Sequence, residues 1–141
     1  MECNVKIINM QQATSNAEDS EKTELITTAD FKYENSRFYL TYDESILSEC
    51  DETVETTLEL GADYVILTRR GIVTSEMIFI KDRHTLTQYN TPYGEIHINI
   101  FTSQLYVDID ESGGNVSIDY VIDYENKYII KNELKIHISE V

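Results

Sequence analysis

The stretch from Tyr64 to Ile100 decides the fold, and it reads YVILTRRGIVTSEMIFIKDRHTLTQYNTPYGEIHINI. Branched and aromatic residues alternate with polar ones over short runs, and this period of two predicts strands with one buried face. Arg70-Gly71 predicts one turn, because glycine tolerates the positive φ of a tight hairpin. Residues 90–94 (NTPYG) predict another, because proline presets φ and glycine follows at a turn position. The stretch therefore predicts consecutive antiparallel strands.

The same alternation continues on both sides of this stretch. The polar segment 10–22 shows no period and predicts a mobile loop. A flat sheet of about ten strands would leave two exposed edges, and closing it into a barrel removes them. We therefore predict an all-β fold, a single antiparallel up-and-down β-barrel domain over residues 1–141, with a two-sheet sandwich as the alternative. The predicted strands cover 5–8, 23–33, 37–45, 53–60, 64–68, 73–81, 85–89, 95–102, 105–109, 116–124 and 128–140.

The composition of the 141-residue chain limits its partners. The formal net charge is −15 at pH 7, and no basic run exceeds Arg69-Arg70. Such a surface repels nucleic acid and anionic membranes, so neither is an expected partner. The N-terminus has no basic region followed by an apolar core, and no stretch approaches the roughly 20 apolar residues of a membrane span. Together with only two cysteines, these features predict a cytoplasmic protein.

Several short motifs follow one another in a distinctive order along most of the chain. They are Tyr42-x-Glu44, Arg70-Gly71, Met77-x-Phe79, Tyr89-x-Thr91-Pro92-x-Gly94, and Tyr120 before the final strand. This order and spacing resembles the YwiB-like family of small uncharacterised bacterial proteins. The resemblance implies a calycin-like (lipocalin-like) β-barrel and a domain of unknown function. The doubled arginine Arg69-Arg70 departs from the family pattern and leaves open which arginine matches it.

Glu44 and Arg70 are the first candidate site residues. Glu44 shares the parity of Leu40 and Tyr42, so we expect it to point into the barrel. A buried carboxylate needs a partner, and the planar guanidinium of Arg70, at the end of its strand, can engage it in a bidentate way. The pair either anchors a ligand at the mouth of a cavity or plugs the barrel end as a structural ion pair, which is the commoner role of such pairs.

Inward tyrosines are the second group of candidates. Tyr42, Tyr120 and Tyr124 have inward parity, and each offers an apolar ring with a hydroxyl that needs a partner when buried. They could line a small-molecule cavity, or they could belong to a filled core. Tyr89, from the family-like motif, completes the set of ligand-binding candidates.

Catalytic and metal-binding patterns are weak in this sequence. Residues 108–113 (DIDESG) imitate the start of a calcium loop, but the flanking segments are strands, which favours a plain acidic hairpin turn. The three histidines show no zinc spacing, and neither a nucleophile elbow nor a phosphate loop is present. We therefore predict no catalytic residue, no metal and no cofactor.

The predicted function is a non-enzymatic module that binds a small organic ligand. The alternative is a protein-interaction module with a filled barrel, in which exposed aromatics such as Tyr39, Phe101 and Tyr106 meet a basic partner or a second copy of the chain. A third hypothesis makes Glu44 a general acid or base. Pairing with Arg70 would lower the pKa that this role needs raised, so the same geometry argues against an enzyme.

Overall fold

The computed structural model describes residues 1–13, 20–43, 54–71, 74–124 and 128–141. Within these ranges no helix is long and apolar enough to cross a membrane. The described residues form ten strands: β1 (Glu2–Ala13), β2 (Ser20–Glu34), β3 (Arg37–Asp43), β4 (Glu55–Leu60), β5 (Tyr64–Arg70), β6 (Thr74–Ile80), β7 (Arg83–Thr91), β8 (Gly94–Asp110), β9 (Gly113–Tyr124) and β10 (Tyr128–Glu140).

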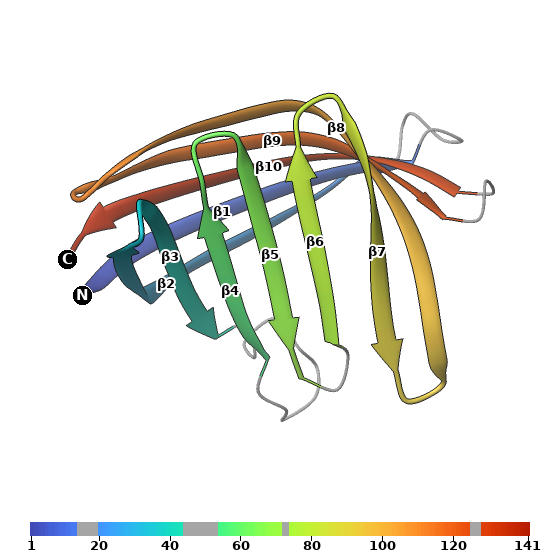
Figure 1. Ribbon diagram of the computed structural model, residues 1–141, viewed down its shortest axis with the longest axis horizontal. Helices are drawn as coiled ribbons and strands as arrows, with labels where there is room; N and C mark the ends of the chain where they lie inside the picture. The colour runs from blue at the N-terminus through green and yellow to red at the C-terminus, as the bar shows by residue number, and fades with distance from the viewer. Residues whose placement is uncertain (14–19, 44–53, 72–73, 125–127) are drawn as a thin grey trace.

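The ten strands close into one antiparallel barrel. Each strand pairs with the strands before and after it in the chain, and β1 pairs with both β2 and β10, which closes the sheet. In Figure 1 the long strands β8, β9, β10 and β1 curve along one side while the shorter β3 to β6 cross the other. Closure gives each of the ten described strands a neighbour on both sides. The predicted up-and-down barrel of about ten strands is confirmed.

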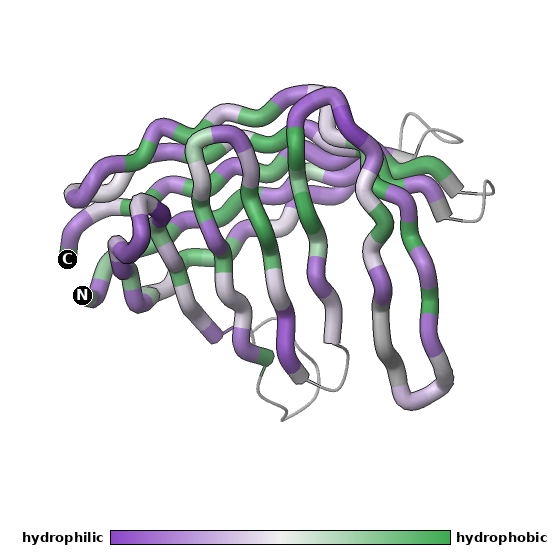
Figure 2. Tube along the Cα trace, viewed as in Figure 1, coloured by the Kyte–Doolittle hydropathy of each residue, from purple (hydrophilic) through white to green (hydrophobic). Residues whose placement is uncertain are grey.

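The core lies inside the barrel and follows from the alternation of side chains along each strand. Along β10, Leu134, Ile136 and Ile138 are buried while the residues between them are exposed. Figure 2 shows the same alternation of hydrophobic and hydrophilic residues on the other strands. Each large apolar side chain buried in this way contributes about 1.5–3 kcal/mol. The largest fully buried apolar side chains are Phe79, Leu40, Leu58, Leu60, Ile100, Ile118, Ile136 and Ile138.

Strand β8 is a single strand of 17 residues, so the prediction of two separate strands, 95–102 and 105–109, was wrong. A β-bulge shifts the register against β9 between Thr102 and Gln104. The extra residue moves the inward positions from even numbers such as Ile100 to odd numbers such as Leu105. Bulges also bend a strand, and β8 is visibly curved in Figure 1.

Strands β1 and β2 are longer than the sequence predicted. Residues 10–13 and 20–22, assigned to a mobile loop, belong to the two strands, and Met10 pairs with both Lys22 and Glu133. The loop prediction was wrong for these residues because their strands continue into a part of the barrel where the side chains are polar. Polar side chains give no alternation of apolar and polar residues, so the sequence pattern does not reveal these strand ends. The rest of the predicted loop, 14–19, lies outside the described residues.

The contact between β6 and β7 is the least regular in the barrel wall. Their register covers two pairs, Thr74 with Asn90 and Ser75 with Tyr89. Nearer the turn, the Thr85 hydroxyl donates to the carbonyl oxygen of Ile78 at 2.5 Å. The Asp82 amide donates to the carbonyl oxygen of Thr102 on β8 at 2.7 Å. The turn after β6 is therefore tied to β8 as well as to β7.

Candidate functional site: a small polar cavity

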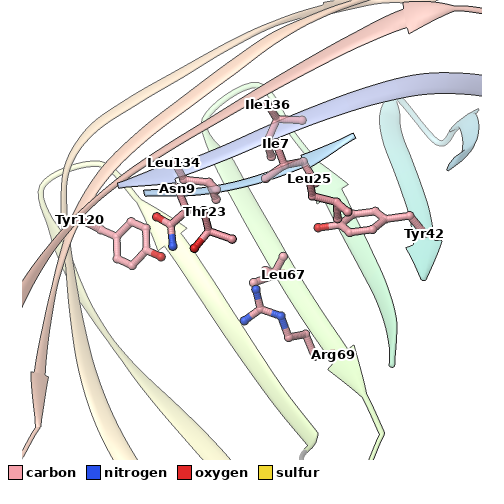
Figure 3. Close-up of a pocket in the computed structure, with 10 residues that line it drawn as sticks. All are labelled: Ile7, Asn9, Thr23, Leu25, Tyr42, Leu67, Arg69, Tyr120, Leu134 and Ile136. Atoms are coloured by element: carbon pink, nitrogen blue, oxygen red, sulfur yellow. The ribbon is translucent and has the colours of Figure 1, made fainter. Parts of the chain in front are cut away.

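A cavity of about 110 Å³ lies inside the barrel, toward the end at which β1, β3, β5 and β9 finish. Figure 3 shows its side chains converging from different strands of the barrel. Aliphatic groups form one part of its wall, and polar groups form the rest. The lining residues are Ile7 and Asn9 on β1, Thr23 and Leu25 on β2, Tyr42 on β3, Leu67 and Arg69 on β5, Tyr120 on β9, and Leu134 and Ile136 on β10.

Strand register explains why polar residues gather at this end. A row of directly paired residues crosses β3 to β7: Tyr42 opposes Thr56, Thr56 opposes Arg69, Arg69 opposes Ser75, and Ser75 opposes Tyr89. Directly opposed residues have their Cβ atoms about 4.5–5.5 Å apart and share one face of the sheet. We call these five residues the polar row. Two members of the polar row, Tyr42 and Arg69, line the cavity.

The arginine that lines the cavity is Arg69, whereas the arginine named as a candidate from the sequence is Arg70. Val65, Leu67 and Arg69 share the inward face of β5, whereas Arg70 is exposed on the outer face. The physical reason is the period of two along a strand, which sends neighbouring side chains to opposite faces. Proximity to the strand end, on which the choice of Arg70 was based, does not decide the face.

The structure describes some of the other candidate residues fully and others in part or not at all. Tyr42 and Tyr120 are 6% exposed and both line the cavity, so their predicted inward orientation is confirmed. The ring of Tyr120 also packs on Phe79, with ring centroids 4.7 Å apart. The backbone of Tyr89 lies in the polar row, and its side chain is not among the described ones. Glu44 lies outside the described residues, so its pairing stays a prediction.

Sequence reasoning missed the polar interior residues next to these tyrosines. In the part of the chain that the structure describes, seven buried side-chain atoms have no hydrogen-bond partner. Four of them lie on Asn9, Thr56, Ser75 and Asn132, toward this end of the barrel. Each occupies an inward position on its strand. Polar residues at inward parity were the available signal, because buried polar atoms normally have partners.

The described lining residues supply hydrogen-bond donors and acceptors and one positive charge. Arg69 supplies a guanidinium with five N–H donors, the two tyrosines supply hydroxyls, and Asn9 supplies an amide. Of the ten lining residues described, none is an acid, a histidine or a cysteine. No three His, Cys, Asp or Glu side chains within the described ranges are grouped to hold a metal ion.

Fold and cavity together define a closed, ten-stranded antiparallel β-barrel with a small, partly polar interior at one end. The chain belongs to the family described as Domain of unknown function (DUF1934), whose model matches residues 5–136. The Uncharacterized beta-barrel protein YwiB of Bacillus subtilis (strain 168) is 27% identical over 103 residues, which cover 72% of this chain and 70% of that relative.

Structural comparison agrees with this assignment. The crystal structure of the ywiB protein from Bacillus subtilis matches with a TM-score of 0.78 and 21% sequence identity, covering 96% of this chain and 90% of that one. At this level of identity the match shows the fold. The family resemblance drawn from the motifs is confirmed, and the protein is a β-barrel protein whose family has no assigned function.

Proposed function

We propose that this protein is a non-enzymatic module that binds a small organic molecule in the barrel cavity. One observation carries the proposal: the Asn9 side-chain oxygen is buried without a hydrogen-bond partner in the wall of a 110 Å³ cavity that Arg69, Tyr42 and Tyr120 also line. A ligand with polar groups supplies the partner that the protein does not.

The energetic cost of the cavity supports this proposal. Protein interiors are usually packed as densely as organic crystals. Side chains around a space of about 110 Å³ forgo the packing contacts that a filled interior would give them. Leaving a buried hydroxyl or amide without a partner costs about 1–3 kcal/mol. A barrel that served only as a rigid scaffold would gain stability by filling this space with aliphatic side chains.

Native mass spectrometry of protein purified gently from its native host tests the proposal. We expect an extra small mass that leaves on denaturation. Leu67→Phe fills the cavity from β5 and should abolish that mass. Ile66→Phe makes the same kind of change on the opposite face of the same strand and should keep it. An apo mass for the wild type, together with no ligand detected in extracts of the purified protein, would contradict the proposal.

An outer groove favours a second candidate function, self-association. Phe101, Val121 and Ile129 line a groove of about 250 Å³ across β8, β9 and β10, together with His84 of β7. The His84 and Phe101 rings lie 4.7 Å apart. Leu86, which pairs with groove residue Asn99, is 67% exposed. Apolar side chains gathered on an outer barrel face favour contact with a second copy of the chain.

Sedimentation equilibrium over a range of protein concentrations tests self-association. We expect a dimer that Leu86→Lys weakens. Ile26→Lys serves as the control, because Ile26 is as exposed as Leu86 and lies on β2, which is not among the strands that form the groove. A monomer at every concentration would discard this second function without affecting ligand binding in the cavity.

A further inference from the structure

We infer that the cavity selects a short monocarboxylate that carries a hydroxyl group, such as a three-carbon hydroxy acid. This inference rests on the proposed ligand-binding function and adds the chemical class of the ligand. It follows from the charge in the cavity, from the partnerless acceptor on Asn9 and from the size of the space.

The charge in the cavity favours a carboxylate. Arg69 is the one charged side chain among the described lining residues. Its planar fork matches the two oxygens of a carboxylate. The guanidinium has five N–H donors, so it can hold a ligand oxygen in addition to an acceptor within the protein. In Figure 3 the guanidinium of Arg69, the hydroxyl of Tyr120 and the amide of Asn9 extend into the same space.

Among the described lining residues Arg69 is the single guanidinium, which also argues against a phosphate or other dianion. Phosphate groups carry about two negative charges near neutral pH, and one arginine balances only half of that. The chain has a formal net charge of −15, so its surrounding field adds to the cost of a second negative charge. A monoanion is therefore the better match to this interior.

The acceptor on Asn9 calls for a neutral donor on the ligand. The Asn9 side-chain oxygen is buried and without a partner. A carboxylate cannot donate to it, whereas a hydroxyl group can. An ammonium group could also donate, but it would lie in the same small cavity as the Arg69 guanidinium and be repelled by it. A hydroxyl group donates to the Asn9 oxygen and carries no positive charge that the Arg69 guanidinium would repel.

The volume and the aliphatic wall limit the rest of the ligand. The cavity of about 110 Å³ is smaller than the roughly 150 Å³ cavity that holds benzene. The ligand is therefore no larger than benzene, which has six non-hydrogen atoms. Lactate has that size, and its methyl group would pack on the aliphatic part of the wall. The aliphatic lining residues are Ile7, Leu25, Leu67, Leu134 and Ile136.

Titrations of the isotope-labelled full chain, followed by two-dimensional amide NMR, test the inference with three matched probes. Lactate carries the charge and the hydroxyl, propionate lacks the hydroxyl, and lactamide lacks the charge. We expect lactate to bind most tightly. Lactamide should bind roughly ten- to a hundredfold more weakly, because a charge-assisted contact is lost. Propionate should bind roughly three- to tenfold more weakly, because a neutral hydrogen bond is lost.

Variants assign these preferences to residues. Arg69→Gln should remove the preference for lactate over lactamide, whereas Arg70→Gln, one residue away on the outer face, should retain it. Asn9→Leu should remove the preference for lactate over propionate and keep the effect of charge. If Arg69→Gln loses the dispersed spectrum of a folded protein, Arg69→Lys replaces it, and we expect weaker lactate binding with the preference for charge retained.

The outcomes separate this inference from the function on which it rests. Lactamide binding as tightly as lactate, or an unchanged preference for lactate over lactamide in Arg69→Gln, overturns the carboxylate assignment. Where Arg69→Lys replaces that variant, lactate affinity equal to that of the wild type overturns it. Equal binding of propionate and lactate overturns the hydroxyl assignment. If none of the probes binds while native mass spectrometry still finds a small ligand that Leu67→Phe removes, the ligand class is wrong and the binding function stands. If that ligand is also absent, both fail.

Discussion

Arg69 and Arg70 are adjacent on β5, and their side chains lie on opposite sides of the barrel wall. Arg69 lines the interior cavity, where its neighbours across the sheet are Thr56 and Ser75. Arg70 is exposed and pairs in register with Glu55. Two residues of the same type, one residue apart, thus experience very different solvation, and the difference between them can be measured.

We expect Arg69→Ala to lower the free energy of unfolding by about 1–3 kcal/mol, because the Arg69 stem packs in the interior and its removal enlarges the cavity. Arg70→Ala should change it by less than about 0.5 kcal/mol, as for most surface substitutions. Urea denaturation of both variants at pH 7 measures the two values. Equal losses from both substitutions would contradict the placement of Arg69 inside the barrel.

The period of two along the strands carried most of the fold prediction. It placed Tyr42 and Tyr120 inside the barrel, and both are buried. The strands and the hairpin connections follow from the same pattern. These features are local, since they depend on residues next to one another in the chain.

The remaining features depend on partners distant in sequence. The polar ends of β1 and β2 carry no apolar period, and their pairing with each other and with β10 makes them strands. At the bulge in β8, between Thr102 and Gln104, the inward-facing positions change from even to odd residue numbers. Only the pairing with β9 shows that the two halves form one strand. The arginine in the cavity could have been identified, because Arg69 shares the parity of Leu67.

Thr85 and Thr87 lie two residues apart on β7, and only one hydroxyl is bonded. The Thr85 hydroxyl donates to the Ile78 carbonyl oxygen, whereas the buried Thr87 hydroxyl has no partner. Thr85→Val should therefore destabilise the protein by about 1 kcal/mol, and Thr87→Val should be neutral or stabilising, because it replaces an unsatisfied hydroxyl with a methyl group of similar shape.

Thermal unfolding of the two valine variants measures this difference. A loss of stability in Thr87→Val as large as that in Thr85→Val would mean that the Thr87 hydroxyl is bonded in solution, for example to an ordered water.

Gly94 and Gly114 both have positive φ, at 128° and 142°, but their surroundings differ. A Cβ on Gly94 would meet open space, whereas a Cβ on Gly114 would overlap the carbonyl oxygen of Asp108 across the β8–β9 ladder. Gly94→Ala should cost about 1–2 kcal/mol through backbone strain alone. Gly114→Ala should cost more than about 3 kcal/mol, because backbone atoms must also move. Similar unfolding free energies for the two variants, measured in urea, would contradict this account.

Cys3 makes stability depend on pH in the alkaline range. Burial raises the pKa of the Cys3 thiol, despite the opposing hydrogen bond in which Sγ lies 3.6 Å from the Ala29 carbonyl oxygen. In the unfolded chain a cysteine loses its proton near pH 8.5, at about its ordinary pKa. Above that pH the unfolded state binds fewer protons than the folded state, so the free energy of unfolding falls as pH rises.

We therefore expect wild-type stability to decline between about pH 8 and pH 10, and Cys3→Ala to reduce that slope while lowering stability at pH 7 through lost packing. Tyr64, whose pKa burial also raises, acts in the same direction at still higher pH. Urea denaturation at pH 7, 8, 9 and 10 measures the slopes, with Cys50→Ala as the control that removes the other thiol. A slope that Cys50→Ala reduces and Cys3→Ala leaves unchanged would show that the Cys3 thiol does not carry the effect.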